Sequence, residues 1–146
     1  MKIINKQIFL HTKKQFEIVD ITLHVKTAAV ESGVLNGQMT IFCPHTTASV
    51  RLNHNEELLT QDFMKALYRL APVDQSYAHD LFEVRRNVSP GERTNGHAHV
   101  KSFLLGSSET LIMEKGEIIL GKQQSIFFVE LDGGREREVR INILGE

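Results

Sequence analysis

The stretch Gln124-Ser125-Ile126-Phe127-Phe128-Val129-Glu130-Leu131 decides the fold, because apolar residues occupy both of its alternating sets of positions. Successive side chains of a strand point to opposite faces of the sheet, so a strand that is apolar on both faces is covered on both sides. We therefore predict a central strand here. Glu130 falls on the same face as Ile126 and Phe128.

A carboxylate in such a strand has two interpretations. Burial of the charge is unfavourable unless the group is paired or hydrogen-bonded. Glu130 is therefore either a structural group bonded to Arg or Lys, or a general base with a raised pKa. The sequence favours neither over the other.

Other segments also have strand patterns. We expect strands at the ranges Ile3 to His11, Phe16 to Val25, Gln38 to Phe42, Thr110 to Met113, Glu117 to Leu120 and Glu138 to Leu144. The run Glu114-Lys115-Gly116 is a hairpin signal, and Asp132 to Arg135 is predicted to turn the chain so that the last strand returns along the central one.

Three segments have helical patterns. A short helix is expected at Lys26 to Val34, and another at Asn95 to Leu105. The clearest helix runs from Asn53 to Ala71, with Asn53 as its N-cap, Glu56 in a capping box and Pro72 ending it. The polar segment from Val73 to Thr94 has no regular pattern, and a connection of that length is usually functional or disordered.

Composition limits the possible classes of protein. The chain has 146 residues, which fits one domain of α+β class, and its formal net charge is −1. That charge argues against a broad basic surface for nucleic acid, although not against a local anion pocket. A single cysteine, Cys43, fits a reducing compartment. No segment has the length of a membrane span, so we expect a cytoplasmic protein without a membrane partner.

The stretch from Cys43 to Glu57 is the densest run of polar, reactive side chains. If it is a strand, His45, Ser49 and Arg51 lie on one face of it. The alternative is an ordinary half-exposed strand of an antiparallel sheet. No Walker loop, dinucleotide fingerprint, Cys-x-x-Cys pair or His-Glu-x-x-His helix is present in the sequence.

Three histidines lie in separate predicted elements: His45 before a strand, His79 in the long loop and His99 at a helix start. Three such ligands with a fourth position left for water are typical of a catalytic zinc site, although surface histidines are common. His97 cannot join His99 on one ion if both are helical, because residues two apart on a helix diverge by roughly 200°.

Several motifs resemble the YjbQ family, whose members are often described as secondary thiamine-phosphate synthases. The resemblance rests on these runs: His45-Thr46-Thr47-Ala48-Ser49, Leu52-Asn53-x-Asn55, Tyr77-x-His79-Asp80, Ala98-His99-x-Lys101-Ser102-x-x-Leu105-Gly106, and Gly121-x-x-Gln124-x-Ile126 with Glu130. It implies a mixed, mainly antiparallel β-sandwich with a few helices, a cytoplasmic homotrimer and a thiamine-phosphate synthase activity. The family's polar residues fall on His45, His79, His99, Asn53, Asn55, Gln124 and Glu130. Gln123 departs from the family, which usually has Trp at that position.

Spacing limits how these residues can meet. His45 and Asn53 are eight positions apart, roughly 26 Å along a regular strand, and Gln124 and Glu130 are six apart, roughly 20 Å. Neither pair reaches one small ligand unless a strand bends or the site spans subunits. A trimer with a site at each interface would bring them together.

We therefore consider two functions. In the first, the protein is an enzyme for a small phosphorylated substrate: His45, His79 and His99 hold a divalent metal, Zn²⁺ being expected, and Glu130 acts as general base or orients a ligand histidine. His45 and His99 act with Glu130 in catalysis. The candidate substrate-binding residues are Ser49, Asn53, Asn55, Lys101, Gln124 and Arg135. In the second, the protein is a trimeric anion- or ligand-binding protein without catalysis.

Overall fold

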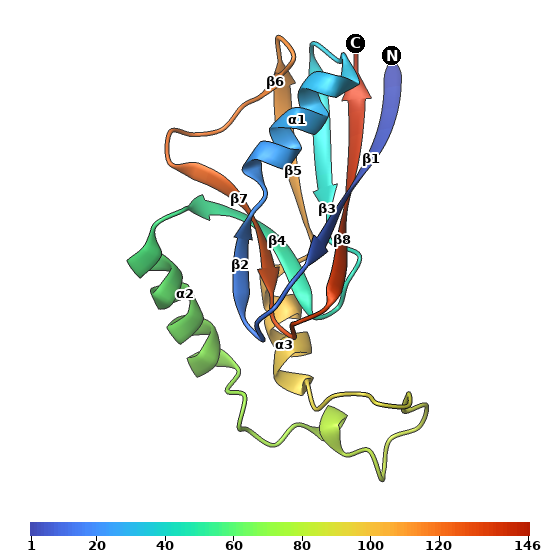
Figure 1. Cartoon of the computed structure of the whole chain (residues 1–146), viewed down its shortest axis with the longest axis vertical. Coiled ribbons are helices and arrows are strands. Elements are labelled where there is room, and N and C mark those ends of the chain that lie inside the picture. The colour runs from blue at the N-terminus through green and yellow to red at the C-terminus, as the bar shows by residue number, and fades with distance from the viewer.

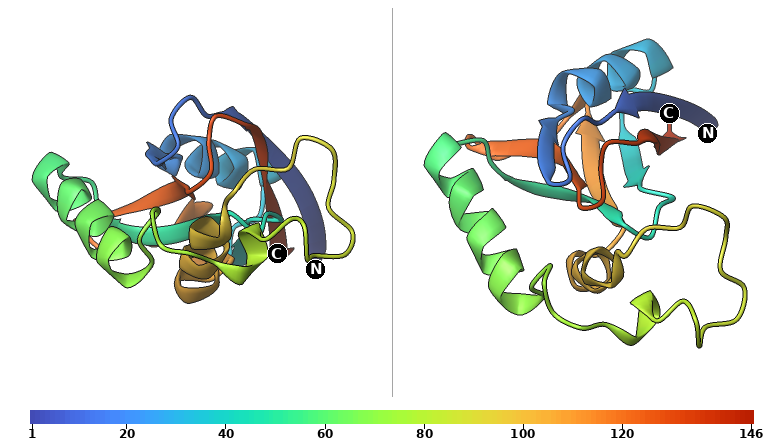
Figure 2. Two further views of the ribbon diagram at one scale, coloured as in Figure 1. Left: turned by 90° about the horizontal axis from the view of Figure 1, so that it is seen from below. Right: turned by 60° about the horizontal axis from the view of Figure 1, so that its bottom comes forward.

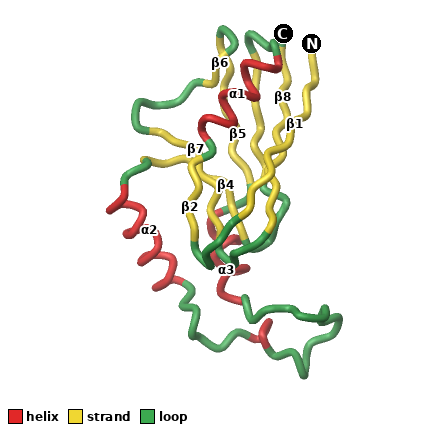
Figure 3. The backbone as a smooth tube through the Cα atoms, in the orientation of Figure 1, coloured by secondary structure: helices red, strands yellow, loops and turns green.

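Two antiparallel sheets pack against each other in the computed structural model, which describes residues 1–146 (Figure 1). The elements in chain order are β1 (Lys2–His11), β2 (Glu17–Asp20), α1 (Thr22–Ser32), β3 (Gly37–Phe42), β4 (Ala48–His54), α2 (Glu57–Leu70), the 3₁₀ turn η1 (Ala78–Asp80), α3 (Gly96–Leu105), β5 (Ser108–Glu114), β6 (Glu117–Ile118), β7 (Gln124–Glu130) and β8 (Glu136–Gly145). The larger sheet has the order β1-β8-β3-β5-β6 and the smaller one β2-β7-β4 (Figure 3). The predicted α+β class with antiparallel strands is confirmed.

β7 is the central strand of the smaller sheet, as its two apolar faces predict. Ile126 and Phe128 point into the main core, which lies between the two sheets and also receives side chains from α1. Phe127 and Val129 point the other way, into a second cluster with Leu67 of α2 and residues of α3. The strand therefore joins two separate apolar layers.

The predicted strand from Phe16 to Val25 is wrong beyond Asp20, because a helix begins at Thr22. The Asp20 carboxylate accepts hydrogen bonds from the backbone N–H and the hydroxyl of Thr22, a local bond that turns the chain out of extended conformation. The buried residues Ile21 and Val25 have helical spacing, whereas Leu23, which alternation placed beside them, is exposed.

The last strand also departs from the prediction. β8 pairs with β1 and β3 rather than returning along β7, because the turn after β7 carries the chain from the smaller sheet to the larger one. The position of α2 is confirmed in its main part, but β4 continues to His54 and the helix begins at Glu57. Its N-cap is therefore Glu56, whose side chain accepts from the Leu59 N–H, and not Asn53.

The end of the sandwich at which β7 finishes and β4 begins carries most of the polar side chains considered below. The partners Glu130 and Ala48 mark this end. α3 lies across it, with η1 and the irregular segment around it, while α2 lies to the side of the smaller sheet (Figure 2). None of the helices combines the length and apolar character that a membrane span requires.

Candidate functional site

Two histidines meet at the end of the sandwich. His79 of η1 and His99 of α3 have ring centroids 4.6 Å apart, with an angle of 65° between the ring planes. The Nε2 atom of His79 is buried and has no hydrogen-bond partner. The nearest carboxylate oxygen is Oε1 of Glu92, at 3.6 Å. The two rings and the free nitrogen form half of a possible metal site, which we call the histidine pair.

Burial favours the neutral form of His99. Burial lowers the pKa of His99, and the neighbouring His79 lowers it further, against smaller raising effects from Asp132, the Thr46 backbone and Glu92. A neutral imidazole is the form of histidine that binds a metal ion. The lowered pKa of His99 therefore favours the form of this side chain that can act as a ligand.

Arginines gather around the Asp132 carboxylate beside the histidine pair. Nη2 of Arg135 lies 2.7 Å from Asp132 Oδ2, Nη1 of Arg93 lies 3.7 Å from Oδ1, and the Asn95 amide donates to Oδ2 at 2.8 Å. Burial alone would raise the pKa of Asp132, but the bonds from Asn95 and Arg135 lower it in sum. Two partly exposed guanidinium groups share one carboxylate here, so the cluster has positive charge left for an anion.

Glu130 is fully buried, and both of its carboxylate oxygens are bonded. Arg137 donates from Nε to Oε2 at 2.7 Å and from Nη2 to Oε1 at 2.6 Å. Thr12 donates at 2.8 Å, and the backbone N–H groups of Leu131 and Asp132 donate at 2.9 Å. Burial alone would raise the pKa of Glu130, yet these hydrogen bonds, that from Arg137 first, lower it. The contacts support the structural interpretation, and a general-base role stays a prediction.

His45 lies with this ion pair rather than with the histidine pair. Its Nε2 atom is 3.0 Å from the backbone nitrogen of Glu138 and 3.1 Å from the carbonyl oxygen, while Nδ1 makes no hydrogen bond within the protein. Burial and the charge of Arg137 lower the pKa of His45. Nowhere in the chain do three His, Cys, Asp or Glu side chains converge as metal ligands. One chain therefore does not bring His45, His79 and His99 together.

The remaining predicted residues are divided between two places. Asn53, Asn55 and Gln124 lie at the far end of the smaller sheet, where Asn55 donates to Asp20 at 2.9 Å and Gln124 accepts from the Gly121 N–H at 2.8 Å. Because β4 and β7 are regular and His54 pairs with Gln124, this end is six pairs from Glu130. The separation that the spacing predicted is thus confirmed within one chain.

Ser49 and Lys101 have partners other than the histidine pair. Ser49 is fully buried and donates its hydroxyl to the carbonyl of Gly106. Lys101 lies one helical turn from His97, with its Nζ atom 3.0 Å from His97 Nδ1. Neither side chain bonds to the histidine pair.

Sequence reasoning missed Arg137, Arg93 and Asn95. Arg137 had a signal, because it shares the buried alternation of Val139 and Ile141 on β8, and an inward cation needs an inward anion such as Glu130. Arg93 had none: its position beside Asp132 depends on the path of an irregular segment.

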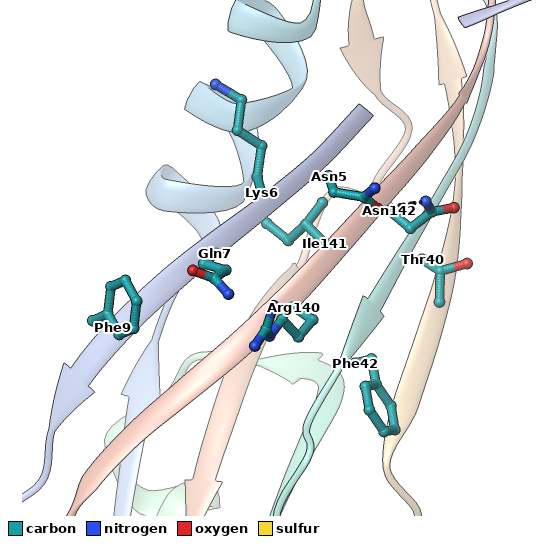
Figure 4. A pocket seen from close by; sticks show the side chains of 9 residues that line it. All are labelled: Asn5, Lys6, Gln7, Phe9, Thr40, Phe42, Arg140, Ile141 and Asn142. Atoms are coloured by element: carbon teal, nitrogen blue, oxygen red, sulfur yellow. Dashed lines mark hydrogen bonds between the residues drawn. The ribbon is translucent and has the colours of Figure 1, made fainter. Parts of the chain in front are cut away.

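The outer face of the larger sheet carries a separate shallow hollow of about 560 Å³ (Figure 4). Its charged side chains are Lys6 and Arg140, and it contains no histidine or carboxylate. It therefore lacks the acid and base groups found at the histidine pair.

The fold and the polar end together define an α+β sandwich protein with α3 and η1 at one end. The chain belongs to the YjbQ-like UPF0047 protein family, whose family model matches residues 6–146. It is 34% identical over 146 residues to a UPF0047 protein of Methanothermobacter thermautotrophicus, covering 100% of this chain and 95% of the relative. It is 35% identical over 140 residues to the UPF0047 protein YugU of Bacillus subtilis, covering 96% and 98%.

Solved structures agree with this membership. A YbjQ-like protein of unknown function from Sulfolobus solfataricus P2 superposes with a TM-score of 0.90 at 34% identity, covering 99% of both chains. The hypothetical protein APE1520 of Aeropyrum pernix K1 superposes with a TM-score of 0.86 at 31% identity, covering 97% of this chain and 98% of that one. The family and the fold are thereby established, and neither of them specifies a reaction.

Proposed function

We propose that this protein is a metal-dependent enzyme for a small phosphorylated substrate, with its site completed between copies of the chain. The observation that carries the proposal is the histidine pair, with its buried, unpartnered His79 Nε2 atom. A buried polar atom without a partner is uncommon in a folded protein, and a ligand is one explanation for it. The cytoplasm suits such a protein, since its one cysteine, the buried Cys43, stays reduced there.

The donor set suits a borderline metal ion such as Zn²⁺, because imidazole nitrogens are among its preferred ligands. His79 and His99 supply two ligands. His45 of a neighbouring copy is the proposed third, since its Nδ1 atom is free of protein hydrogen bonds. Exposed apolar side chains of α3, Phe103 and Leu104, lie on the helix that carries His99 and favour contact with a second copy.

The basic cluster defines the role of the chain's own residues toward substrate. A bound divalent cation would supply Lewis acidity at a phosphoryl oxygen. Arg135 and Arg93 bind the phosphate oxygens through planar guanidinium groups, and Asp132 fixes the orientation of both. Following the family resemblance, the first reaction to test is the joining of a pyrimidine diphosphate to a thiazole phosphate with release of pyrophosphate; phosphate-ester hydrolysis is the second.

Metal analysis of the protein tests the proposal. After removal of metal with a chelator and reloading with Zn²⁺, we expect about one ion per chain in the native protein. His79→Ala and His99→Ala should each lose it, whereas His24→Ala, which removes an exposed histidine of α1, should keep it. Stoichiometric zinc in the His79 and His99 variants would contradict the assignment.

A second candidate function, anion binding without catalysis, is favoured by the two arginines that share Asp132. In that case phosphate binds in the presence of chelator, and calorimetry shows it. Arg135→Met should weaken phosphate binding while His99→Ala leaves it unchanged, and no substrate is turned over with or without metal.

A further inference from the structure

Lys101 is a buried ammonium group without a carboxylate partner. Its residue is only 4% exposed, and His97 Nδ1, at 3.0 Å, is its one hydrogen-bond partner. The nearby acids have other partners, since Asp132 bonds to Arg135 and Asn95, and Asp80 accepts from the Gly96 N–H. Lysine is almost never fully buried unless it is paired, so an anion is missing from this environment.

His97 has a matching deficiency. Its side chain lies almost completely inside the protein, and its Nε2 atom has no hydrogen-bond partner. When the Lys101 ammonium donates to Nδ1, the imidazole proton must lie on Nε2. The two side chains therefore present buried N–H donors that the protein does not satisfy.

Both side chains line a cavity of about 150 Å³ between α2 and α3. The rest of its wall is largely apolar and includes Phe16, Leu67 and Leu131. A cavity of roughly 150 Å³ with apolar walls has the size that holds one benzene ring. His97 and His99 diverge by roughly 200° around α3, so the cavity and the histidine pair lie on opposite sides of that helix.

We propose that this cavity binds a small aromatic carboxylate, with the carboxylate on the free donors of Lys101 and His97 and the ring among Phe16, Leu67 and Leu131. The carboxylate supplies the missing negative charge and accepts hydrogen bonds from the unsatisfied N–H groups. Charge-assisted hydrogen bonds of this kind are stronger than neutral ones. The site uses neither the metal nor the phosphate of the proposed function.

Benzoate and its neutral analogue benzamide test the proposal by calorimetry in the presence of chelator. We expect saturable benzoate binding. Benzamide should bind at least about tenfold more weakly than benzoate, because it lacks the charge that pairs with Lys101. Lys101→Met should remove benzoate binding. Lys65→Met removes the same charge from an exposed position on α2 and should leave binding unchanged.

A second variant keeps the test valid if Lys101→Met does not fold. Val73 lines the cavity and is partly exposed, so Val73→Trp can fill the space from its edge without disturbing the core. It should abolish benzoate binding. His79→Ala should retain binding, so the fate of the metal proposal leaves this one unaffected. Absence of benzoate binding, equal affinity for benzamide, or full binding by a folded Lys101→Met would overturn the assignment.

Discussion

At the scale of single residues, we expect removal of one partner of the buried Glu130–Arg137 pair to cause a large loss of stability. Arg137 also bonds to the hydroxyl of Thr47, so its guanidinium joins β7 and β8 to the residue that precedes β4. Arg137→Ala leaves the Glu130 carboxylate buried without its counter-charge, and we expect a loss of about 3–5 kcal/mol in the free energy of unfolding. Urea unfolding followed by circular dichroism measures it.

The control for this loss is Arg140→Ala. Arg140 pairs with Glu138 at 3.3 Å but is half exposed, so its removal should change stability by no more than about 0.5 kcal/mol. Similar losses in the two variants would show that the buried pair has no special role.

Three histidines with lowered pKa values should make the stability of the fold sensitive to acid. Burial lowers the pKa of His45, His97 and His99 from the ordinary value of 6.5. Below that value the unfolded chain binds protons that the folded chain rejects, so the free energy of unfolding falls as the pH falls through about 6.5. At lower pH the depressed pKa values of Glu130 and Asp132 add a loss in the same direction.

Thermal melts between neutral and mildly acidic pH check this dependence. His97→Gln should make the midpoint less sensitive to pH, while His24→Gln, at an exposed position, should follow the native protein. A midpoint that stays constant across the range would contradict the expected linkage.

At single residues, the sequence predicted the side-chain positions that follow from alternation along a strand. It missed most of the contacts that depend on the path of a loop. The burial of Glu130 followed from its apolar neighbours on β7, and the inward position of Arg137 could have followed in the same way. The proximity of His79 and His99 was expected from the three-histidine hypothesis rather than from alternation, because it depends on how η1 packs against α3. His45 has its Nε2 atom at the Glu138 backbone, a contact that no spacing reveals.

Among the elements, α2 is expected to be the least stable helix. Leu67 is its only buried residue, and the helix packs on β7 through the smaller apolar cluster. Few buried contacts mean that local opening takes less free energy than global unfolding. Hydrogen exchange should therefore release the α2 amides well before those of β7; equal protection of the two elements would refute this.

β3 and β8 approach each other closely at Gly37, so a methyl group added at this position should be destabilising. A Cβ atom on Gly37 would lie 2.1 Å from the carbonyl oxygen of Leu144 and 2.8 Å from the Cα atom of Gly145. β3 cannot move away without breaking its ladder with β8, so Gly37→Ala should cost about 1–3 kcal/mol or more.

Gly91→Ala is the matched control for this substitution. Gly91 has φ of +71° and open space around its Cα atom, so only the strain of the left-handed backbone, roughly 1 kcal/mol, is expected. Denaturant unfolding compares the two, and a milder effect at Gly37 than at Gly91 would contradict the steric argument.

The elements themselves were predictable where periodicity is long. α2, α3 and β7 followed from their patterns with small shifts at the ends. The change from β2 to α1 did not, because Ile21 and Val25 fit both periods and a local bond from Thr22 to Asp20 decides between them. The partners of β8 could not be predicted from the sequence either, because the residues of a turn do not show with which sheet the next strand pairs.

At the scale of the whole molecule, the proposed site needs a second copy of the chain. Phe103 is 87% exposed on α3, which carries His99. We expect sedimentation to show a trimer, and Phe103→Asp to weaken it because a charge would enter the apolar contact. Phe9→Asp, at a residue 74% exposed on β1, is the control and should leave the assembly intact. A native monomer at micromolar concentration would contradict the shared site.

The pairing of β1 with β8 places the two ends of the sequence side by side, with Lys2 opposite Gly145. Among the strands of this domain a ribosome makes β1 before all others and β8 after them, so the strand that joins β1 to β3 is missing while the others are made. Contacts this distant along the chain form slowly because a long loop must close first. Until β8 is made, the nascent chain therefore exposes unpaired edges of β1 and β3, and unpaired strand edges promote aggregation.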